Sequence, residues 1–207
     1  MSTSIAPQQD RSLRTQQALI DAFVKLLKKQ SFDEITVAQI AAEAGLTTGA
    51  IYRRFKDKRA LLAGAFERFY EDAVEHQQSR VEATKDKTGI DLVEFMVRTT
   101  IEFGTPYLPL MRAASSLNDQ TSFAYMRDAR NLTADWWCMQ VKSSTLPEDE
   151  LKRRIRFSMR TITAVFRDTL MAGPGSETGS SGSQKRTVDQ MVSELTIMIG
   201  QYLAIED

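Results

Sequence analysis

Gly45 separates two short segments of the chain, and each segment repeats apolar residues with the spacing of a helix. The first segment has apolar residues three, one and three positions apart, which puts them on one helical face: Val37, Ile40, Ala41 and Ala44. Thr36 can cap the start of this helix, and Gly45 can adopt the left-handed conformation that ends it. The second segment restarts at Thr47, and its inward residues are Ile51 and Phe55. Two short helices joined by a sharp turn are therefore predicted.

Longer amphipathic segments precede and follow this pair. The segment Ser12–Gln30 has an apolar face made of Ile20, Phe23, Val24 and Leu27. Asp57 can cap a further helix, which runs to about residue 80 and has a polar end at Glu75–Gln78. Its inward residues are Leu62, Ala65, Phe66 and Phe69. No strand pattern of comparable strength is found, so the expected fold class is all-α, with an N-terminal three-helix helix-turn-helix domain.

The second helix of the pair can present hydrogen-bonding groups to the outside. Its outward residues, and the bases that follow them, are Thr48, Gly49, Tyr52, Arg53, Arg54, Lys56, Lys58 and Arg59. Hydroxyl, phenol and guanidinium groups bind phosphate oxygens and base edges, and Gly49 allows the backbone to approach a partner closely. The same helical corner also occurs in proteins that bind no nucleic acid, so the spacing alone does not decide between the two interpretations.

The charge of the chain is unevenly distributed. The formal net charge is zero. Residues 11–59 contain ten basic and five acidic residues, so this segment carries a net charge of +5 and the remainder carries −5. Such asymmetry in a neutral protein indicates that one part faces a polyanion, although a solvated helix surface would have a similar charge. Together with the outward donors, the basic segment favours DNA as the partner.

The run from Ile35 to Leu62 resembles the signature of the TetR family of bacterial repressors. The residues in register with that signature are Thr36, Ile40, Ala41, Gly45, Tyr52, Phe55, Lys58, Leu61 and Leu62. The resemblance implies that phosphates are held by Thr36, Tyr52 and Lys58, and that bases are faced by Thr48, Gly49, Ala50 and Arg53. The full predicted DNA-binding set is Thr36, Thr47, Thr48, Gly49, Tyr52, Arg53, Arg54 and Lys58. Arg54 stands where many members have His, and Ala38 where some have a longer side chain, so the resemblance does not give the operator sequence.

The rest of the chain has the pattern of further helices, expected over residues 90–103, 120–141, 147–170 and 188–202. The domains we predict are a flexible tail over 1–10, the helix-turn-helix DNA-binding domain over 11–59, and a larger helical ligand-binding and dimerisation domain over 60–207. The last domain includes a connecting helix over about 57–80 and a Gly- and Ser-rich flexible loop over about 173–184.

Bulky apolar side chains in the C-terminal part fit either ordinary core packing or a binding pocket. In the family that the chain resembles, a C-terminal helical domain commonly encloses a small-molecule pocket, and Met and aromatic side chains suit such a cavity. The predicted lining residues are Phe95, Met96, Thr99, Phe103, Met111, Trp137 and Phe157. An apolar or amphipathic effector is expected, whose identity the sequence does not reveal.

The resemblance also implies a homodimer in which the last two helices pair with their copies as a four-helix bundle. The predicted interface residues are Ile155, Ile162, Phe166, Leu195, Ile199 and Tyr202. Packing within one chain would explain the same apolar stripes. A dimer would place two recognition helices in successive major grooves of a near-palindromic operator.

Catalysis is disfavoured because the residues it would need are scarce. His76 is the single histidine and lies in a polar stretch, and Cys138 is the single cysteine, next to two tryptophans. No catalytic residue, cofactor or metal site is predicted. No apolar run approaches the roughly 20 residues of a membrane helix. The first ten residues lack the apolar stretch of a signal peptide, so we expect a cytoplasmic protein without membrane association.

The leading hypothesis is a sequence-specific DNA-binding regulator, specifically a repressor that an apolar or amphipathic small molecule releases from its operator. One alternative is a helical enzyme or small-molecule-binding protein whose basic face is incidental. Another is a DNA-binding regulator without a small-molecule ligand. Selective binding of DNA by the purified chain would separate the first and third hypotheses from the second.

Overall fold

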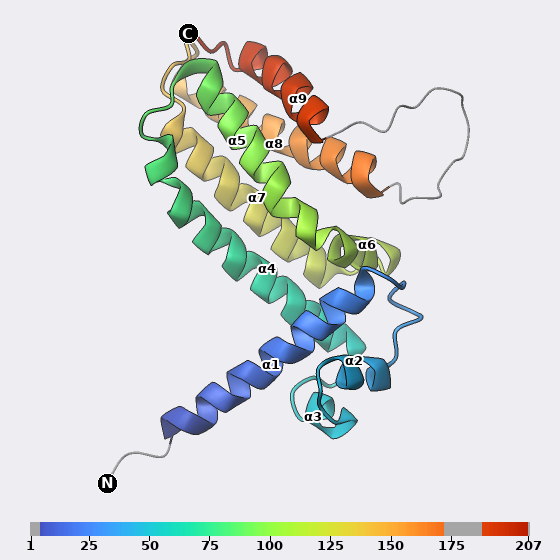
Figure 1. The fold of residues 1–207 in the computed structure, drawn as a ribbon. Coiled ribbons are helices and arrows are strands. Elements are labelled where there is room, and N and C mark those ends of the chain that lie inside the picture. Colours follow the sequence, from blue (N-terminus) through green and yellow to red (C-terminus); the bar gives the residue numbers. More distant parts are fainter. Residues whose placement is uncertain (1–4, 172–187, 207) are drawn as a thin grey trace, which may run out of the picture. The chain divides into compact units, whose positions relative to one another are not determined.

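The computed structural model describes residues 5–171 and 188–206, and it confirms the all-α prediction. The helices are α1 Ile5–Leu27, α2 Val37–Glu43, α3 Thr48–Tyr52, α4 Lys58–Arg80, α5 Gly89–Gly104, α6 Leu108–Ser116, α7 Gln120–Gln140, α8 Glu148–Met171 and α9 Val188–Tyr202 (Figure 1). Two short 3₁₀ turns, Glu82–Thr84 and Thr105–Tyr107, lie between them. Over the described ranges the extended pairing is limited to an isolated bridge between Ser144 and Ile205.

By their internal contacts, the described residues form two compact units. Unit 1 comprises Met1–Phe69 and Pro109–Tyr125, and unit 2 comprises Tyr70–Leu108 and Met126–Asp207. The boundary therefore falls within α4, later than the predicted domain boundary after residue 59. The predicted loop over 173–184 lies outside the described residues, as do residues 1–4 of the predicted tail.

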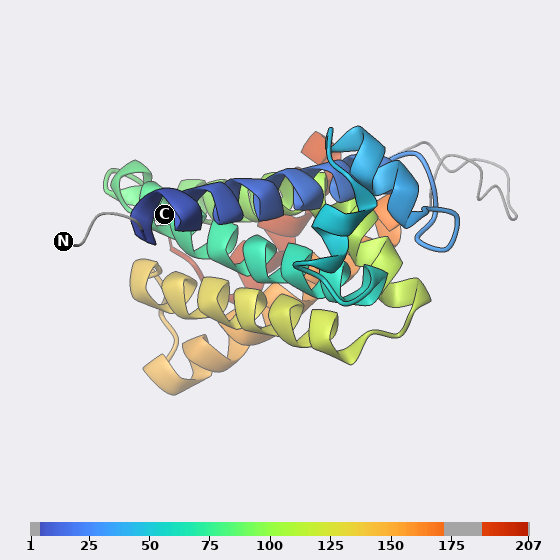
Figure 2. The ribbon, with the colours of Figure 1, turned by 90° about the horizontal axis from the view of Figure 1, so that it is seen from below.

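Unit 1 is organised around α1, with α2 packed against α1 and α3 packed against α2 (Figures 1 and 2). Its buried apolar residues include Leu19, Ile20, Phe23, Ile40, Ile51, Phe55, Leu61, Leu62 and Phe66. These positions agree with the inward faces predicted from the apolar spacing, because burial of one face is what holds short helices together in water.

The ends of α2 have the geometry that the sequence predicts. The Thr36 hydroxyl accepts a hydrogen bond from the Gln39 backbone N–H, and the Gln39 side chain accepts one from the Thr36 backbone N–H, which completes a capping box. At the other end Gly45 has a φ of 65°. Backbone bonds from Leu46 N to Ala41 O and from Gly45 N to Ala42 O close the helix as a Schellman motif.

Unit 2 is organised around α5, which packs extensively against α9 and also contacts α8. Gly200 allows the close approach of α9, because a Cβ atom at this position would lie 2.5 Å from the Ile90 Cδ1 atom. The N-terminal half of α5 contributes the buried residues Leu92, Val93, Met96 and Val97. The observed bounds of α5, α7, α8 and α9 lie within one or two residues of the predicted ones.

Two helices differ from the sequence-based predictions. Helix α1 begins at Ile5, whereas the apolar pattern starts the first helix at Ser12 and assigns residues 1–10 to a tail. Helix α6, which was not predicted from the sequence, begins at Leu108 and has Pro109 in its first turn. Proline is compatible with the first turn of a helix, where its missing N–H would have no intrahelical partner.

Replacing Gly45 with Ala is expected to lower the free energy of unfolding by about 1–2 kcal/mol, because a Cβ atom is disfavoured at positive φ even though nothing lies within 4 Å of its position. Urea denaturation measures the change. Gly49→Ala is the matched control: Gly49 is a helical glycine in open surroundings, so alanine is expected to leave stability equal or raise it by about 0.5–1 kcal/mol. Equal losses in both variants would contradict the role of the left-handed turn.

Candidate nucleic-acid interface

Helix α3 is held by one buried face and exposes the opposite one. Ala50, Ile51 and Phe55 are buried in unit 1. Because side chains three and four positions apart share a helical face, this burial turns Thr48 and Gly49 outward, and both are exposed. Burial of Ala50 also removes it from the set of residues that the family resemblance places against bases.

Tyr52 and Arg53 end this helix and lie on its exposed side. The Tyr52 side chain is 60% exposed. A Cβ atom built on Gly49 would lie 3.8 Å from both Arg53 Nη1 and Thr47 Oγ1. Thr47, Gly49 and Arg53 therefore border one surface, with a hydroxyl and a guanidinium on either side of exposed backbone. Thr47 occupies the N-cap position of α3, but its hydroxyl makes no capping bond.

Thr36 lies at the start of α2 and is exposed, but its hydroxyl already has a structural role. It accepts from the Gln39 backbone N–H at 3.2 Å and donates to Gln39 Oε1 at 2.9 Å. A phosphate oxygen at this position would have to accept the hydroxyl proton in place of Gln39 Oε1. The predicted phosphate contact at Thr36 would replace that additional bond and leave both bonds of the capping box in place.

Arg54 does not extend away from the protein. Its Nε donates to the Ser12 backbone carbonyl at 3.2 Å, and its Nη2 lies 3.3 Å from the Ser12 hydroxyl. These bonds connect the chain after α3 to α1, which is a positioning role that the sequence pattern does not reveal. Arg54 is half-buried as a result.

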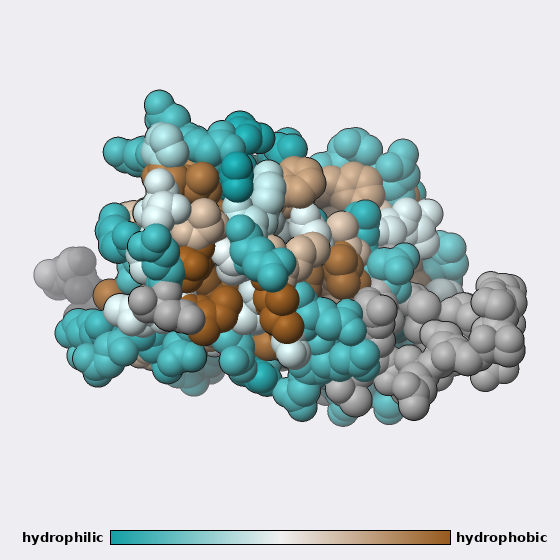
Figure 3. Space-filling model, turned by 90° about the horizontal axis from the view of Figure 1, so that it is seen from above, coloured by the Kyte–Doolittle hydropathy of each residue, from teal (hydrophilic) through white to brown (hydrophobic). Residues whose placement is uncertain are grey.

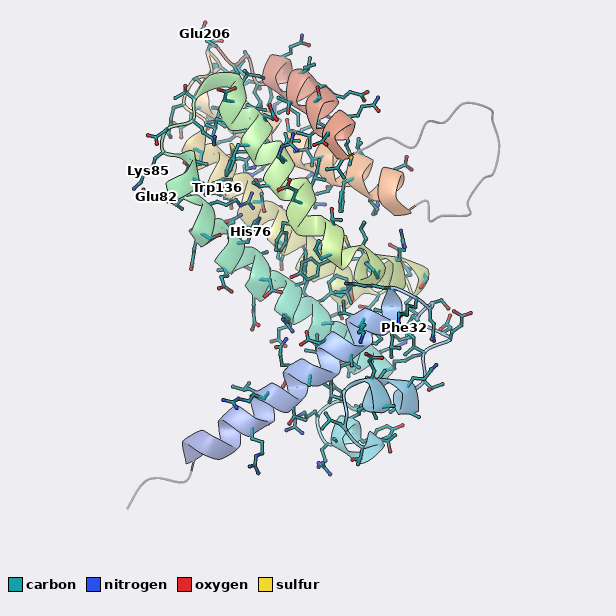
Figure 4. The ribbon with its side chains drawn as sticks, viewed as in Figure 1. Phe32, His76, Glu82, Lys85, Trp136 and Glu206 are labelled. Carbon is teal, nitrogen blue, oxygen red and sulfur yellow. The ribbon has the colours of Figure 1, made fainter. Side chains whose placement is uncertain are left out.

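The ammonium group of Lys58 also binds within the protein. Its ammonium donates to the backbone carbonyls of Phe32 and Ile35, the second at 2.8 Å, and it lies 4.2 Å from the centre of the Phe32 ring. Phe32 is labelled in Figure 4. Burial lowers the pKa of Lys58, and Asp33 opposes that effect. Two of the three ammonium donors are thus used to hold the loop between α1 and α2, so at most one remains for a phosphate.

The basic residues of unit 1 differ in how far they are neutralised. Lys25 pairs with Glu43, and Arg68 pairs with Asp21 at 2.7 Å. Around α3 the exposed bases Arg53, Lys56 and Arg59 form no ion pair within the part of the chain that the structure describes. The end of α3 and the start of α4 therefore present positive charge next to the exposed surface of Thr47, Gly49 and Arg53.

Residues 19–65 match the sequence model of a family described as bacterial regulatory proteins, tetR family. A curated relative, the HTH-type transcriptional regulator CymR of Pseudomonas putida, is 29% identical over 103 residues. The N-terminal part of the chain, residues 19–65, is thus similar to the TetR family. The match to CymR covers half of this chain and spans half the length of that relative.

Solved structures are similar to this chain over most of its length. A transcriptional regulator from Cytophaga hutchinsonii has a TM-score of 0.69 and 13% identity, with 90% of this chain and 96% of that chain covered. The regulator FadR of Bacillus subtilis, solved in complex with stearoyl-CoA, has a TM-score of 0.56 and 16% identity, with 91% and 97% covered. At these identities the likeness shows the fold alone.

The predicted pocket residues are divided between the two units. Met96 and Trp137 are fully buried in unit 2, and Thr99 and Phe103 lie on α5 in the same unit. Met111 belongs to unit 1. Phe157 is 57% exposed, and its ring contacts Tyr202 at 5.7 Å between centroids, which does not fit a role inside a pocket.

The predicted interface residues are buried within their own chain. They include Ile155, Ile162, Phe166, Leu195 and Ile199, all of which belong to the core of unit 2. Of the predicted set, only Tyr202 reaches the surface. The apolar spacing correctly predicts a buried face but does not reveal whether the same chain or a partner covers it.

Sequence reasoning also missed a buried polar face. Gln77, Arg80 and Thr84 are all buried in unit 2, whereas the sequence predicts only a polar end of this helix at residues 75–78. Their positions continue the inward register of Phe66, Phe69 and Ala73, and this register was the signal that could have identified them.

Other kinds of site are not supported by the described part of the chain. Within residues 5–171 and 188–206 no group of three or more His, Cys, Asp or Glu side chains is placed to hold a metal ion. None of the helices there has both the length and the apolar character needed to cross a membrane. Burial raises the pKa of Cys138, which disfavours the reactive thiolate.

Lys58→Met is expected to lower the free energy of unfolding by about 1–2 kcal/mol, because the carbonyls of Phe32 and Ile35 lose a charged donor. Chemical denaturation of purified variants measures the loss. Lys56→Met, two residues earlier at an exposed position, is the matched control and is expected to leave stability unchanged. If both variants unfold at the same denaturant concentration as the original chain, Lys58 does not stabilise the loop.

Proposed function

We propose that this chain is a dimeric, sequence-specific DNA-binding regulator without catalytic activity. Its α3 would read an operator, and a small molecule bound in unit 2 would control the affinity for DNA. The observation that carries the proposal is the exposed surface of α3, where Thr47, Gly49 and Arg53 meet above buried Ile51 and Phe55. Exposed donors on a short, firmly seated helix suit the major groove of DNA.

The roles that we assign within this surface follow from exposure and hydrogen bonding. Arg53 has a free fork of donors at the surface and would contact a base edge, for which guanine is the usual partner of arginine. The Tyr52 hydroxyl would hold a phosphate. Arg54 and Lys58 would act as positioning residues, because their donors already hold α1 and the loop before α2.

One protein of similar fold supports the proposal of a small-molecule effector. Among the fold relatives, FadR of Bacillus subtilis was solved with stearoyl-CoA, which is a property of that protein. By analogy we assign effector binding to unit 2 of this chain. Release of the operator on effector binding would make the chain a repressor, with promoter occlusion as the simplest mechanism.

The outward faces of α8 and α9 support a homodimer. Phe157 and Ile197 are each 57% exposed, and Met198 is also exposed. Met198 and Tyr202 lie one helical turn apart on α9, and Tyr202 contacts Phe157, so the three make a continuous apolar strip. Figure 3 shows apolar residues gathered among hydrophilic ones on the face seen from above. Exposed apolar strips of this kind typically mark interfaces, and a twofold dimer would favour a near-palindromic operator.

The test of DNA binding is selection from a pool of random duplexes with the purified chain, followed by sequencing. Enrichment of one near-palindromic motif is expected, and the affinity for it should fall about 10³- to 10⁵-fold between 50 and 200 mM salt if six to ten phosphates are contacted. A pool that stays unenriched would contradict the proposed function.

Arg53→Ala is expected to reduce discrimination between the selected operator and a scrambled duplex by roughly 1–3 kcal/mol, because it removes a base contact. Tyr52→Phe removes one hydroxyl and is expected to weaken binding to both duplexes equally, by about 1 kcal/mol. Fluorescence anisotropy on both duplexes measures the two effects. Equal losses on both duplexes for Arg53→Ala would remove Arg53 from base recognition.

Ile197→Glu is expected to separate the dimer and leave the subunit folded, because the carboxylate would be buried only in the interface, at a cost of roughly 3 kcal/mol or more. Leu195→Glu places the same charge in the core of unit 2 and is expected to unfold it. Sedimentation and circular dichroism distinguish these outcomes. Leu13→Glu, at an exposed leucine of unit 1, is the control that should change neither measurement. A stable dimer of Ile197→Glu would place the interface elsewhere.

A further inference from the structure

Arg80 is a buried cation without an anionic partner. Its side chain is 6% exposed, in the interior of unit 2. Its Nε donates to the His76 carbonyl at 3.4 Å, and its Nη1 donates to the Thr99 hydroxyl. Both acceptors are neutral, and among the described residues no carboxylate pairs with the guanidinium. Burial alone lowers the pKa of Arg80 to about 10, so the group stays charged at neutral pH.

The surroundings of Arg80 are rich in donors and poor in acceptors. Gln77 lies one turn earlier on the same buried face of α4, and its Nε2 has no acceptor among the described residues. The Trp136 ring lies 5.1 Å from the Arg80 guanidinium carbon, and its indole N–H is likewise buried without an acceptor. Guanidinium, amide and indole N–H groups are complementary to a carboxylate, which when ionised only accepts hydrogen bonds.

The groups around these donors are apolar or aromatic. Thr99, which accepts from Arg80, lies on the same side of α5 as Met96 and Phe103. The Phe103 ring stacks on His76 with centroids 4.8 Å apart and planes 18° apart. Figure 4 shows His76 of α4 and Trp136 of α7 in the region where these helices run alongside α5. A ligand that meets the donors at one end would therefore meet aromatic and Met side chains with the rest of its body.

His76 does not compensate the charge of Arg80 or compete with it. Burial, and to a lesser extent the neighbouring Arg80, lower the pKa of His76, while the Thr99 carbonyl at 3.5 Å opposes this shift. His76 is thus neutral at neutral pH. An anion next to Arg80 would therefore meet one full positive charge together with neutral donors.

We propose that Arg80 binds the carboxylate of an amphipathic organic acid in the interior of unit 2, with Gln77 and Trp136 as further donors. The proposal rests on the proposed function, in which unit 2 holds the effector, and it specifies the chemical class of that effector. Buried charges in proteins are nearly always paired, because the desolvation of an isolated ion is costly. The carboxylate of the acid supplies an anionic partner for Arg80. It also supplies acceptors for the N–H groups of Gln77 and Trp136.

The test uses the full-length protein and its own tryptophans. The chain has two tryptophans, and Trp136 and Trp137 are both buried in unit 2, so intrinsic fluorescence reports on this region. The probes are benzoate, 4-phenylbutyrate and decanoate, each titrated beside its primary amide at constant ionic strength. At least one acid is expected to change the fluorescence saturably and to raise the melting temperature. Its amide is expected to bind at least about tenfold more weakly, because it lacks the charge.

Arg80→Met is expected to weaken binding of that acid by about 10- to 100-fold, whereas Arg80→Lys, which keeps a positive charge, is expected to lose less. Arg98→Met is the matched control in the same unit. Arg98 already pairs with Asp189 and Glu94, so its removal is expected to leave binding of the acid unchanged. Circular dichroism checks that each variant folds, and the comparison of acid with amide in the unchanged chain decides the outcome if Arg80→Met does not fold.

Three results would overturn the proposal: equal binding of acid and amide, unchanged binding by folded Arg80→Met, or no response to any of the three acids. If inorganic phosphate reproduces the fluorescence change and displaces the acid, the site binds any anion and the proposal is also overturned. These measurements need no DNA. An acid that binds through Arg80 but leaves operator affinity unchanged would support the site and contradict the control by effector in the proposed function.

Discussion

The arrangement of the candidate DNA surface depends on the burial of three residues, Ala50, Ile51 and Phe55. Helix α3 has five residues, and a helix of that length has no stability of its own in water. Its orientation is therefore set by tertiary packing, not by helix propensity. The Schellman turn at Gly45 brings the chain to the position from which this packing is possible, and Arg54 and Lys58 hold the neighbouring segments in place.

Some basic side chains bond within the protein and others stay exposed, so basic residues next to one another in the sequence differ in their roles. Arg53 and Arg54 are consecutive, yet one lies at the surface and the other bonds to Ser12. Lys56 and Lys58 differ in the same way. A charge count over residues 11–59 correctly indicates a basic segment, but only part of that charge is available to a partner. The cations already bound to backbone carbonyls contribute to the rigidity of the surface that presents the others.

The features predictable from sequence were those that local chemistry determines. The N-cap at Thr36, the left-handed Gly45 and most of the inward residues of α1 to α4 follow from residue type and spacing, and they are confirmed. What the sequence could not provide was the identity of the surface that covers an apolar face. Ile155 and Leu195 have the spacing expected of an interface, but their own chain buries them. Likewise, nothing about Arg80 as a residue type indicates burial.

Helix α4 belongs to both units, with Lys58 at its start and Arg80 at its end. At the first end the cation has carbonyl partners, and at the second no carboxylate among the described residues pairs with it. An acid bound at Arg80 would relieve the cost of that buried charge, but this free energy affects DNA binding only to the extent that it differs between the DNA-bound and free states. Reciprocity then requires that operator DNA weaken binding of the acid by the same factor by which the acid weakens binding of DNA. A strong acid site with no such difference would stabilise unit 2 without regulating anything, so regulation requires that the surroundings of Arg80 differ between the DNA-bound and free states.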